Sequence, residues 1–200
     1  MPPRNLTSAA ERLLGAAMEL FAEKGYERTT VGEIQEAAGL TFGSGALYKH
    51  FASKQAVLEE GVERFVESAR SERRLLGSLD GRSVADAMTT IAQLAMASFD
   101  RDRDALRIAW RDLEGFPELQ EKVRTERIRA TFDDFSAWLG RQAEAQRVVP
   151  HDTQAVAAVA LGSLAFFQLL KFLMHDTPAG VDERRFVEAW TRLFVDALSA

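Results

Sequence analysis

The chain contains no cysteine, and this absence removes several kinds of chemistry at once. Without cysteine there is no disulfide, no thiol nucleophile and no thiolate ligand for a metal ion. The three histidines, His50, His151 and His175, lie far apart in the sequence, and none has the spacing of a metal-binding motif such as His-Glu-x-x-His. We therefore predict no metal site and no bound cofactor.

The sequence also lacks the patterns of a β-sheet and of common catalytic loops. No stretch alternates apolar and polar residues for long enough to predict a strand, and there is neither a Gly-x-Ser-x-Gly elbow nor a phosphate-binding loop. We therefore predict an all-α protein that is not an enzyme. The first residues, MPPRNLTSAAERLL, have no long apolar core and no small-residue cleavage pattern, so we expect no secretory signal and a cytoplasmic protein.

Neither basic nor acidic residues are in large excess over the other. The 200 residues include 25 Lys and Arg against 30 Asp and Glu, and 46% of them are hydrophobic. This composition is typical of a soluble globular protein rather than of a disordered one. Apolar spacing and capping residues predict about nine helices, near residues 9–24, 31–38, 44–51, 54–76, 84–99, 105–113, 117–145, 153–174 and 183–198.

Residues 29–54 predict two short helices joined by a glycine turn. Thr30 and Glu33 have the spacing of a capping box, which marks the start of the first of these helices. Gly39 stands where the end of a helix requires a positive φ. The apolar face of this helix is predicted to comprise Ile34, Ala37 and Ala38.

The second short helix, predicted over residues 44–51, has two apolar anchors four residues apart, Leu47 and Phe51. These anchors would hold the helix to a core from behind and leave the polar and aromatic side chains between them exposed. A small helix held in this way is what a helix-turn-helix needs to enter the major groove of DNA.

The segments GYERTTVGEIQEAAGL and SGALYKHFASKQAVL, in this order, resemble the N-terminal DNA-binding domain of TetR-family transcriptional regulators. The resemblance runs from residue 13 to about residue 58. It implies a helix-turn-helix DNA-binding domain in residues 1–53 and a helical ligand-binding and dimerisation domain in residues 54–200. The implied function is that of a ligand-responsive dimeric repressor on a palindromic operator, or of an activator with the same fold. The stretch from Gly39 to Leu47 is two residues longer than in most members.

The resemblance places contacts with double-stranded DNA on the exposed side of this motif. Thr30 and Lys54 are predicted to contact phosphates, the alternatives being a helix cap and a solvated lysine. Lys49 and His50 are the long side chains that we expect to contact base edges or nearby phosphate. The full predicted set is Thr30, Thr41, Ser44, Gly45, Ala46, Tyr48, Lys49, His50 and Lys54.

The predicted DNA-binding domain is electrically neutral, which is unusual for a nucleic-acid reader. Up to Lys54 the acidic and basic side chains are equal in number, but residues 37–58 contain no acid at all. The predicted DNA face is therefore positive only locally. We expect few phosphate ion pairs and a shallow dependence of operator affinity on salt.

The region 84–175 is rich in aromatic residues and methionine, each of which by default belongs to a core. The resemblance implies that some of them enclose a mostly apolar cavity for a small effector, and we predict an apolar or aromatic ligand. Possible additional polar contacts are Arg107, Asp112 and His175. The predicted lining comprises Met88, Phe99, Trp110, Phe132, Phe135, Phe166 and Gln168.

Residues 155–170 are apolar nearly all round, so a helix there must be covered on more than one face. As a membrane span the segment falls short of about twenty apolar residues and is interrupted by Gly162, Ser163 and Gln168. We therefore predict no membrane partner and a second subunit instead. The resemblance implies a homodimer through the last two helices, with two-fold symmetry and a palindromic DNA site.

Two other functions stay open from the sequence. A hydrolase could use residues that are distant in the chain, and a helical interaction protein could retain the helix-turn-helix without reading DNA. Specific retention of a palindromic DNA fragment separates the first interpretation from both of these.

Overall fold

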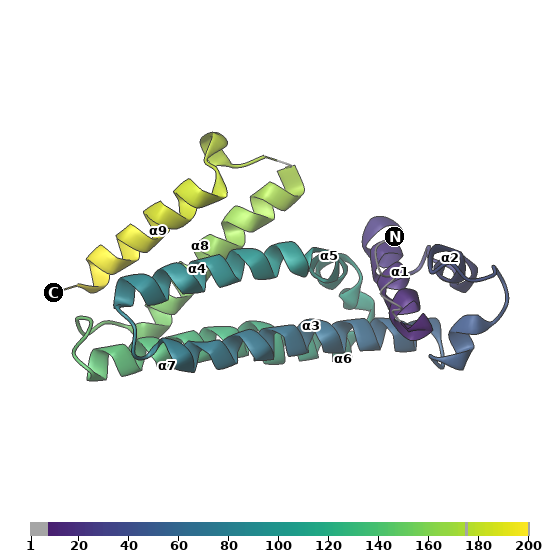
Figure 1. Ribbon diagram of the computed structural model, residues 1–200, viewed down its shortest axis with the longest axis horizontal. Coiled ribbons are helices and arrows are strands. Elements are labelled where there is room, and N and C mark those ends of the chain that lie inside the picture. The colour runs from purple at the N-terminus through teal and green to yellow at the C-terminus, as the bar shows by residue number, and fades with distance from the viewer. Residues whose placement is uncertain (1–7, 175, 200) are drawn as a thin grey trace, which may run out of the picture. The chain divides into compact units, whose positions relative to one another are not determined.

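The computed structural model describes residues 8–174 and 176–199, and all regular structure within those ranges is helical (Figure 1). The all-α prediction is therefore confirmed for the described residues. The α-helices are α1 (Ala9–Lys24), α2 (Val31–Ala37), α3 (Lys54–Leu76), α4 (Val84–Arg101), α5 (Arg103–Arg111), α6 (Pro117–Lys122), α7 (Ala130–Glu144), α8 (Thr153–Met174) and α9 (Glu183–Leu198).

The chain divides into two compact units. The first comprises Met1–Glu67 with Asp102–Val123, and the second comprises Ser68–Arg101 with Arg124–Ala200. The division falls inside α3, which runs without interruption from Lys54 to Leu76. The assignment of DNA binding to residues 1–53 and of effector binding to residues 54–200 stays a prediction.

The first unit is built around α1, which begins at a capping box. The Ser8 hydroxyl oxygen accepts the Glu11 backbone N–H at 3.2 Å, and the Glu11 carboxylate accepts the Ser8 backbone N–H at 3.0 Å. The inner face of α1 packs against α2, the first half of α3 and α5, which buries a continuous apolar core. The fully enclosed side chains of this core are Leu13, Ala17, Phe21, Ile34, Leu47, Val57, Leu58 and Val66.

The second unit packs α4, α7, α8 and α9 around Trp138, the largest fully buried side chain. Its last two helices lie side by side in Figure 1. The Trp190 indole N–H of α9 lies within hydrogen-bonding distance of the Ala160 carbonyl at 3.1 Å and of the Ser163 hydroxyl at 3.0 Å. The rings of Phe167 and Phe186 stack with their centroids 4.0 Å apart. These side-chain contacts connect α8 and α9.

Three boundaries differ from the sequence-based expectation. The second helix of the helix-turn-helix is a 3₁₀ turn over Ala46–Lys49, shorter than the predicted residues 44–51. The helix predicted over residues 117–145 is interrupted by a π-helical segment, Val123–Arg129. Only Asp102 separates α4 from α5, whereas the predicted helices left residues 100–104 as a turn between them. Apolar spacing could not show these differences, because it barely distinguishes the three hydrogen-bonding patterns over one or two turns.

Helix α8 is long and apolar enough to cross a membrane by length and composition alone. The stretch Thr153–Phe172 has a mean hydropathy of 1.8, yet only 28% of its most apolar window is buried within the chain. On this helix, Val159 is 63% exposed and Phe166 is 60% exposed. One face of this helix therefore presents an apolar surface that the rest of the described chain does not cover.

Candidate nucleic-acid interface

The N-terminus of α2 is closed by its own side chains. The Thr30 hydroxyl oxygen accepts the Glu33 backbone N–H at 3.3 Å, and the Glu33 carboxylate accepts the Thr30 backbone N–H at 2.8 Å, which confirms the predicted capping box. The Thr30 hydroxyl donates to the same carboxylate at 2.7 Å, and Lys24 forms an ion pair with it. The polar groups of Thr30 thus already have partners within the chain, and a contact of Thr30 with phosphate stays a prediction.

These contacts lower the pKa of the Glu33 carboxyl to about 2. The largest cause is the hydrogen bond from Lys24, followed by those from the Thr30 backbone and hydroxyl, all of which favour the charged form. Because the pKa in the folded state is depressed, the stabilisation is present above the ordinary value of 4.5 and is lost as the pH falls through about 2.

We predict that Glu33→Gln flattens the dependence of the thermal midpoint on pH between about 4.5 and about 2, because glutamine has no charge to lose. The measurement is thermal unfolding followed by circular dichroism across this range. Glu23→Gln, which removes an exposed carboxylate from α1, is the matched control. If wild type and Glu33→Gln gave parallel pH profiles, the contacts of Glu33 would not be formed in solution.

The turn after α2 depends on glycine at defined positions. Gly39 has φ of 72°, as predicted, and Gly45, directly before the 3₁₀ turn, has φ of 68°. A side chain at either position would be strained, because L-residues rarely adopt this conformation. The Leu40 backbone N–H donates to the Gln35 carbonyl at 2.8 Å and closes the end of α2. This bond holds the start of the turn to the end of α2.

Gln35 anchors the segment of residues 46–51, here called the reading segment, and the sequence did not reveal this role. Its side chain is 1% exposed, and its Oε1 accepts the Leu47 backbone N–H at 3.1 Å. Ala37, which was predicted on the apolar face of α2, is exposed instead, and Gln35 is buried in its place. A polar residue is buried here because the reading segment satisfies its amide, and a hydrophobic pattern cannot show that.

The reading segment presents its polar side chains outward, as predicted. Leu47 is fully buried and Phe51 packs against the same core, so the segment is held from behind. Of the predicted DNA contacts, Thr41, Ser44, Tyr48, Lys49 and His50 are exposed and lie within ten residues, whereas Gly45 and Ala46 are half-buried.

The ammonium group of Lys54 already has partners within the chain. It donates to the carbonyls of Tyr26 and Thr29, each at 2.9 Å, and lies 4.2 Å from the centroid of the Tyr26 ring. An ammonium has three N–H donors, of which these bonds use two. Lys54 therefore ties the start of α3 to the connection between α1 and α2, and its contact with a phosphate stays a prediction.

Phe42, in the lengthened turn, both covers α2 and faces solvent. A Cβ atom on Gly32 would lie 2.5 Å from the Phe42 ring, so glycine at this position leaves the space for the aromatic side chain. Phe42 is nevertheless 63% exposed. The turn thus presents an aromatic surface beside the predicted DNA contacts.

The same stretch matches a known family. Residues 13–60 fit the model of bacterial regulatory proteins of the tetR family. Residues 13–60 belong to the TetR family. This span includes α1, α2, the turn and the reading segment, and it ends shortly after α3 begins.

Relatives extend the likeness beyond this domain. The chain is 36% identical over 101 residues to the transcriptional repressor KstR2 of Rhodococcus jostii, a match that spans 48% of each chain, or about half the length of that relative. It is 29% identical over 182 residues to the transcriptional activator FasR of Mycolicibacterium smegmatis, covering 86% of this chain and 75% of that one. The solved structure of the regulator FadR from Bacillus subtilis in complex with stearoyl-CoA has 16% identity and a TM-score of 0.69, over 94% of this chain and 98% of that one. This last likeness shows that the fold of the whole chain is that of a known regulator.

The residues predicted to line an effector cavity are not gathered at one place. Met88, Phe135 and Gln168 are buried in the second unit, and the Gln168 amide donates to the Met96 sulfur at 2.9 Å. Phe99 and Phe132 are half-buried, and Phe166 is 60% exposed. Trp110 is 77% exposed and belongs to the first unit. Of the polar contacts, Asp112 pairs with Arg111, Arg107 lies on α5, and His175 lies outside the described residues.

The exposure of Trp110 follows from its place on α5. Ile108, two residues earlier, is buried, and two residues on a helix are separated by about 200°, so Trp110 points to the opposite side. Phe166 and Phe167 differ in the same way, with Phe167 buried and Phe166 outward. The sequence identified these residues as large and apolar, but not which of them would face a cavity.

Arg111 holds α5 against the TetR-family domain, and the sequence did not single it out. Its guanidinium donates to the carbonyl of Phe21 and, at 3.1 Å, to that of Ala22, both in the last turns of α1. Asp112 pairs with the same guanidinium at 3.0 Å. Carbonyls at the C-terminal end of a helix carry the negative end of the helix dipole and favour a cation, which explains the contact.

Proposed function

We propose that this protein is a ligand-responsive, dimeric transcriptional regulator that binds a palindromic operator and represses transcription from it. The observation that carries the proposal is the reading segment. It is fixed from behind by Leu47 and Gln35 and exposes Tyr48, Lys49 and His50 within a TetR-family domain. A helix-turn-helix arranged in this way places its exposed side chains against base edges and phosphates of the major groove.

The proposed dimer uses the uncovered face of α8 and α9. Their exposed apolar side chains border a groove of about 340 Å³ that is lined by Val159, Ser163, Phe186, Ala189, Trp190, Leu193, Phe194 and Ala197. Gly162, on α8, has no neighbouring atom within 4 Å of where a Cβ would lie, which leaves room for a second helix to approach closely. Ala157, by contrast, is buried within the chain and does not belong to this face. A second copy of the chain would cover this face, because identical apolar patches complement each other across a two-fold axis.

Two-fold symmetry determines the expected DNA site. The two reading segments would contact equivalent half-sites one helical turn, about 34–36 Å, apart or a multiple of this distance, so the operator would be an approximate palindrome. The lack of acidic residues between Ala37 and Leu58 keeps the contacting surface locally positive although the domain is neutral. We therefore expect specificity to come mainly from geometry and half-site spacing.

The proposed effector is a small, mostly apolar molecule bound in the second unit. FadR, whose fold is similar, was solved with stearoyl-CoA. The indole N–H of Trp138 on α7 is buried without a hydrogen-bond acceptor among the described residues. An unpaired buried donor carries a free-energy cost that a carbonyl or hydroxyl of a ligand would remove. Effector binding would act by shifting the dimer between states with different separations of the reading segments.

The test of DNA binding is selection of operators from a randomised double-stranded library, followed by fluorescence anisotropy on the recovered sequence. We expect an approximate palindrome and a shallow salt dependence. Lys49→Ala should weaken binding about 3- to 10-fold and reduce the slope of log affinity against log salt by about 2, because each of the two subunits loses one phosphate contact. Arg184→Ala, which removes an exposed cation from α9, is the control. Failure to enrich any sequence would favour an interaction protein that does not read DNA.

Activation is the second candidate mode, and the similarity to the activator FasR over most of both chains favours it. A reporter gene placed behind the selected operator distinguishes the two modes. Repression is expected to lower reporter output when the protein is expressed, and activation to raise it.

A further inference from the structure

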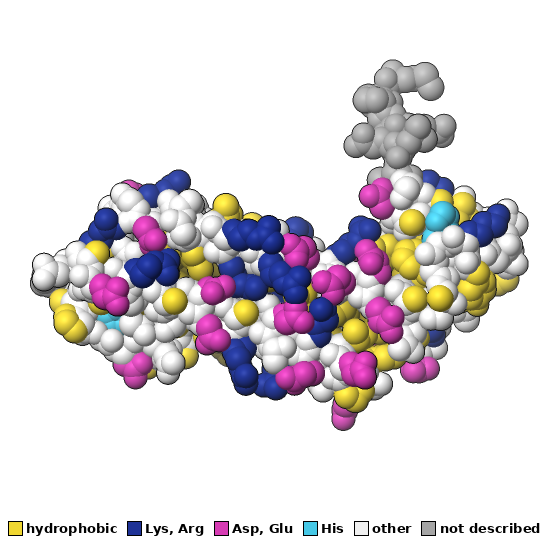
Figure 2. Space-filling view, turned by 90° about the horizontal axis from the view of Figure 1, so that it is seen from below, with side chains coloured by type: hydrophobic (Ala, Val, Ile, Leu, Met, Phe, Trp, Pro, Cys, Tyr) yellow, Lys and Arg dark blue, Asp and Glu magenta, His cyan; other side chains and the backbone are white. Residues whose placement is uncertain are grey.

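Phe42 is a large apolar residue that the chain leaves exposed among its predicted DNA contacts. Two of those contacts, Thr41 and Ser44, flank it in the turn, and a third, Tyr48, is itself 60% exposed. Figure 2 shows apolar side chains exposed next to basic ones in the region of α2 and the reading segment. Apolar surface in contact with water is unfavourable, so a partner that covers the Phe42 ring would gain free energy.

A tight turn fixes the backbone at Phe42. The Thr41 carbonyl accepts the Ser44 backbone N–H at 3.2 Å, and Phe42 and Gly43 lie between these two residues. Of the two central residues only Gly43 has a positive φ, 70°, which is the pattern of a type II β-turn. Phe42 therefore stands at the corner of a hydrogen-bonded turn rather than in a loose loop.

Gly32 of α2 supports one edge of the Phe42 ring. A Cβ atom at Gly32 would lie 2.5 Å from Cε2 and 2.6 Å from Cζ of the ring, which is closer than such atoms approach one another. The ring thus rests against the backbone of α2, while Phe42 as a whole stays 63% exposed. A ring held at one edge is preorganised for a contact, because little side-chain freedom remains to be lost on binding.

The partner that suits this ring is an apolar group of the DNA itself. Residues 37–58 contain no acid, so the surface around Phe42 does not repel DNA. A phenyl ring has no N–H or O–H to donate to a phosphate oxygen. In the major groove the apolar group that a base edge presents is the 5-methyl group of thymine. The turn directly precedes the reading segment, and the start of a reading helix is where side chains contact base edges.

We propose that Phe42 contacts the 5-methyl group of one thymine in each half-site and so selects thymine at that position of the operator. The inference rests on the proposed function, because it requires an operator that is read in the major groove. Phe42 is not among the predicted DNA contacts. It would recognise a base through apolar contact, beside Lys49 and His50, which offer charge and hydrogen bonds.

The test replaces thymine by deoxyuridine in the selected operator, one position at a time and symmetrically in both half-sites. This change removes the methyl group and keeps every hydrogen-bonding group of the base. At one thymine position we expect the wild type to bind about 15-fold more weakly, because burial of one such group corresponds to about 4-fold in each half-site. Fluorescence anisotropy measures the affinity.

Phe42→Ala should weaken binding to the thymine operator by a similar factor. It should then be insensitive to deoxyuridine at that one position, because the two changes remove the same contact. The slope of log affinity against log salt should stay that of the wild type, since an apolar contact releases no counterions, in contrast to Lys49→Ala. Leu75→Ala, which truncates an exposed apolar side chain of α3, is the control and should leave the affinity unchanged.

Gly32→Ala displaces the Phe42 ring without removing it. The φ of Gly32 lies outside the left-handed region, and alanine favours a helix more than glycine does, so the thermal midpoint should not fall. Operator binding should nevertheless weaken, because the ring loses its position against α2. Addition of Gly32→Ala to Phe42→Ala should cause no further loss of affinity.

The outcomes separate this inference from the proposed function. Wild-type affinity of Phe42→Ala for an operator that the wild type selects would overturn the inference and leave the regulator intact. A loss in Phe42→Ala that adds in full to the effect of deoxyuridine at every thymine would exclude contact with a methyl group and overturn it as well. Failure to select any operator would remove the proposed function and, with it, this inference.

Discussion

Replacement of Leu193 by aspartate is expected to convert the protein into a folded monomer that binds its operator at least about 100-fold more weakly, because joining two binding modules typically raises affinity by about 10²–10⁴. Leu193 on α9 is 69% exposed within its own chain, so the substitution removes few internal contacts. In the proposed interface, the carboxylate would be buried without a partner, which costs far more than the lost apolar contact.

Size-exclusion chromatography with light scattering measures the mass, and fluorescence anisotropy on the selected operator measures the affinity. Leu193→Met, which keeps the apolar surface, is the matched control and should remain dimeric. A Leu193→Asp protein that stays dimeric would show that the last two helices do not form the interface. A monomer with wild-type affinity would exclude readout by two symmetric subunits.

The second large effect is expected from Gln35→Leu. Leucine fills similar space but leaves the Leu47 backbone N–H buried without an acceptor, which costs about 1–3 kcal/mol. Among the hydrogen bonds described, this is the one side-chain hydrogen bond that joins α2 to the reading segment, and the substitution removes it. We therefore expect a lower thermal midpoint together with a drop in operator affinity of about 10-fold, since a loosened segment must be ordered on binding.

Gln93→Leu, the same replacement at an exposed position of α4, is the control and should change neither quantity appreciably. Thermal unfolding and operator titration are measured on the same preparations. Unchanged operator affinity in Gln35→Leu would mean that the reading segment is positioned by Leu47 and Phe51 alone.

Capping residues and apolar spacing were reliable guides to the helices because both act within a few residues. Asp152 accepts the N–H groups of Gln154 and Ala155 at the start of α8, and Asp182 accepts that of Arg185 at the start of α9. The bounds of α8, Thr153–Met174, are those expected. Gly39 has the predicted positive φ for the same local reason.

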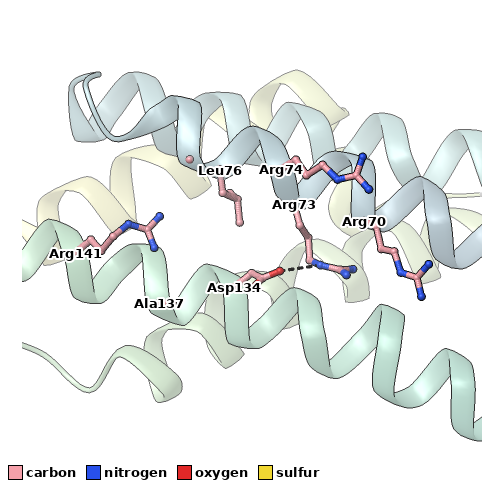
Figure 3. A pocket seen from close by; sticks show the side chains of 8 residues that line it. Arg70, Arg73, Arg74, Leu76, Asp134, Ala137 and Arg141 are labelled. Carbon is pink, nitrogen blue, oxygen red and sulfur yellow. Dashed lines mark ion pairs between the residues drawn. The ribbon is translucent and has the colours of Figure 1, made fainter.

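The arrangement of side chains around each site was less predictable. The π-helical segment, the burial of Gln35 and the outward direction of Trp110 all depend on what packs against a helix. Arg73 of α3 and Asp134 of α7, which pair at 2.8 Å (Figure 3), are 61 positions apart in the sequence. A local sequence pattern cannot predict such contacts, because the charge and hydrophobicity of a residue do not specify which distant residues will pack against it.

The sequence by itself determined the helical content, the capped helix starts and the ordered motif that places residues 13–60 in the TetR family, because these follow from interactions between near neighbours and from residue order. Only the tertiary structure decided that Gln35 supports the reading segment, that Lys54 and Thr30 already have partners within the chain, and that Arg73 of α3 pairs with Asp134 of α7. Those outcomes depend on packing between distant segments, which decides whether a polar group meets water, a partner in the chain or a ligand.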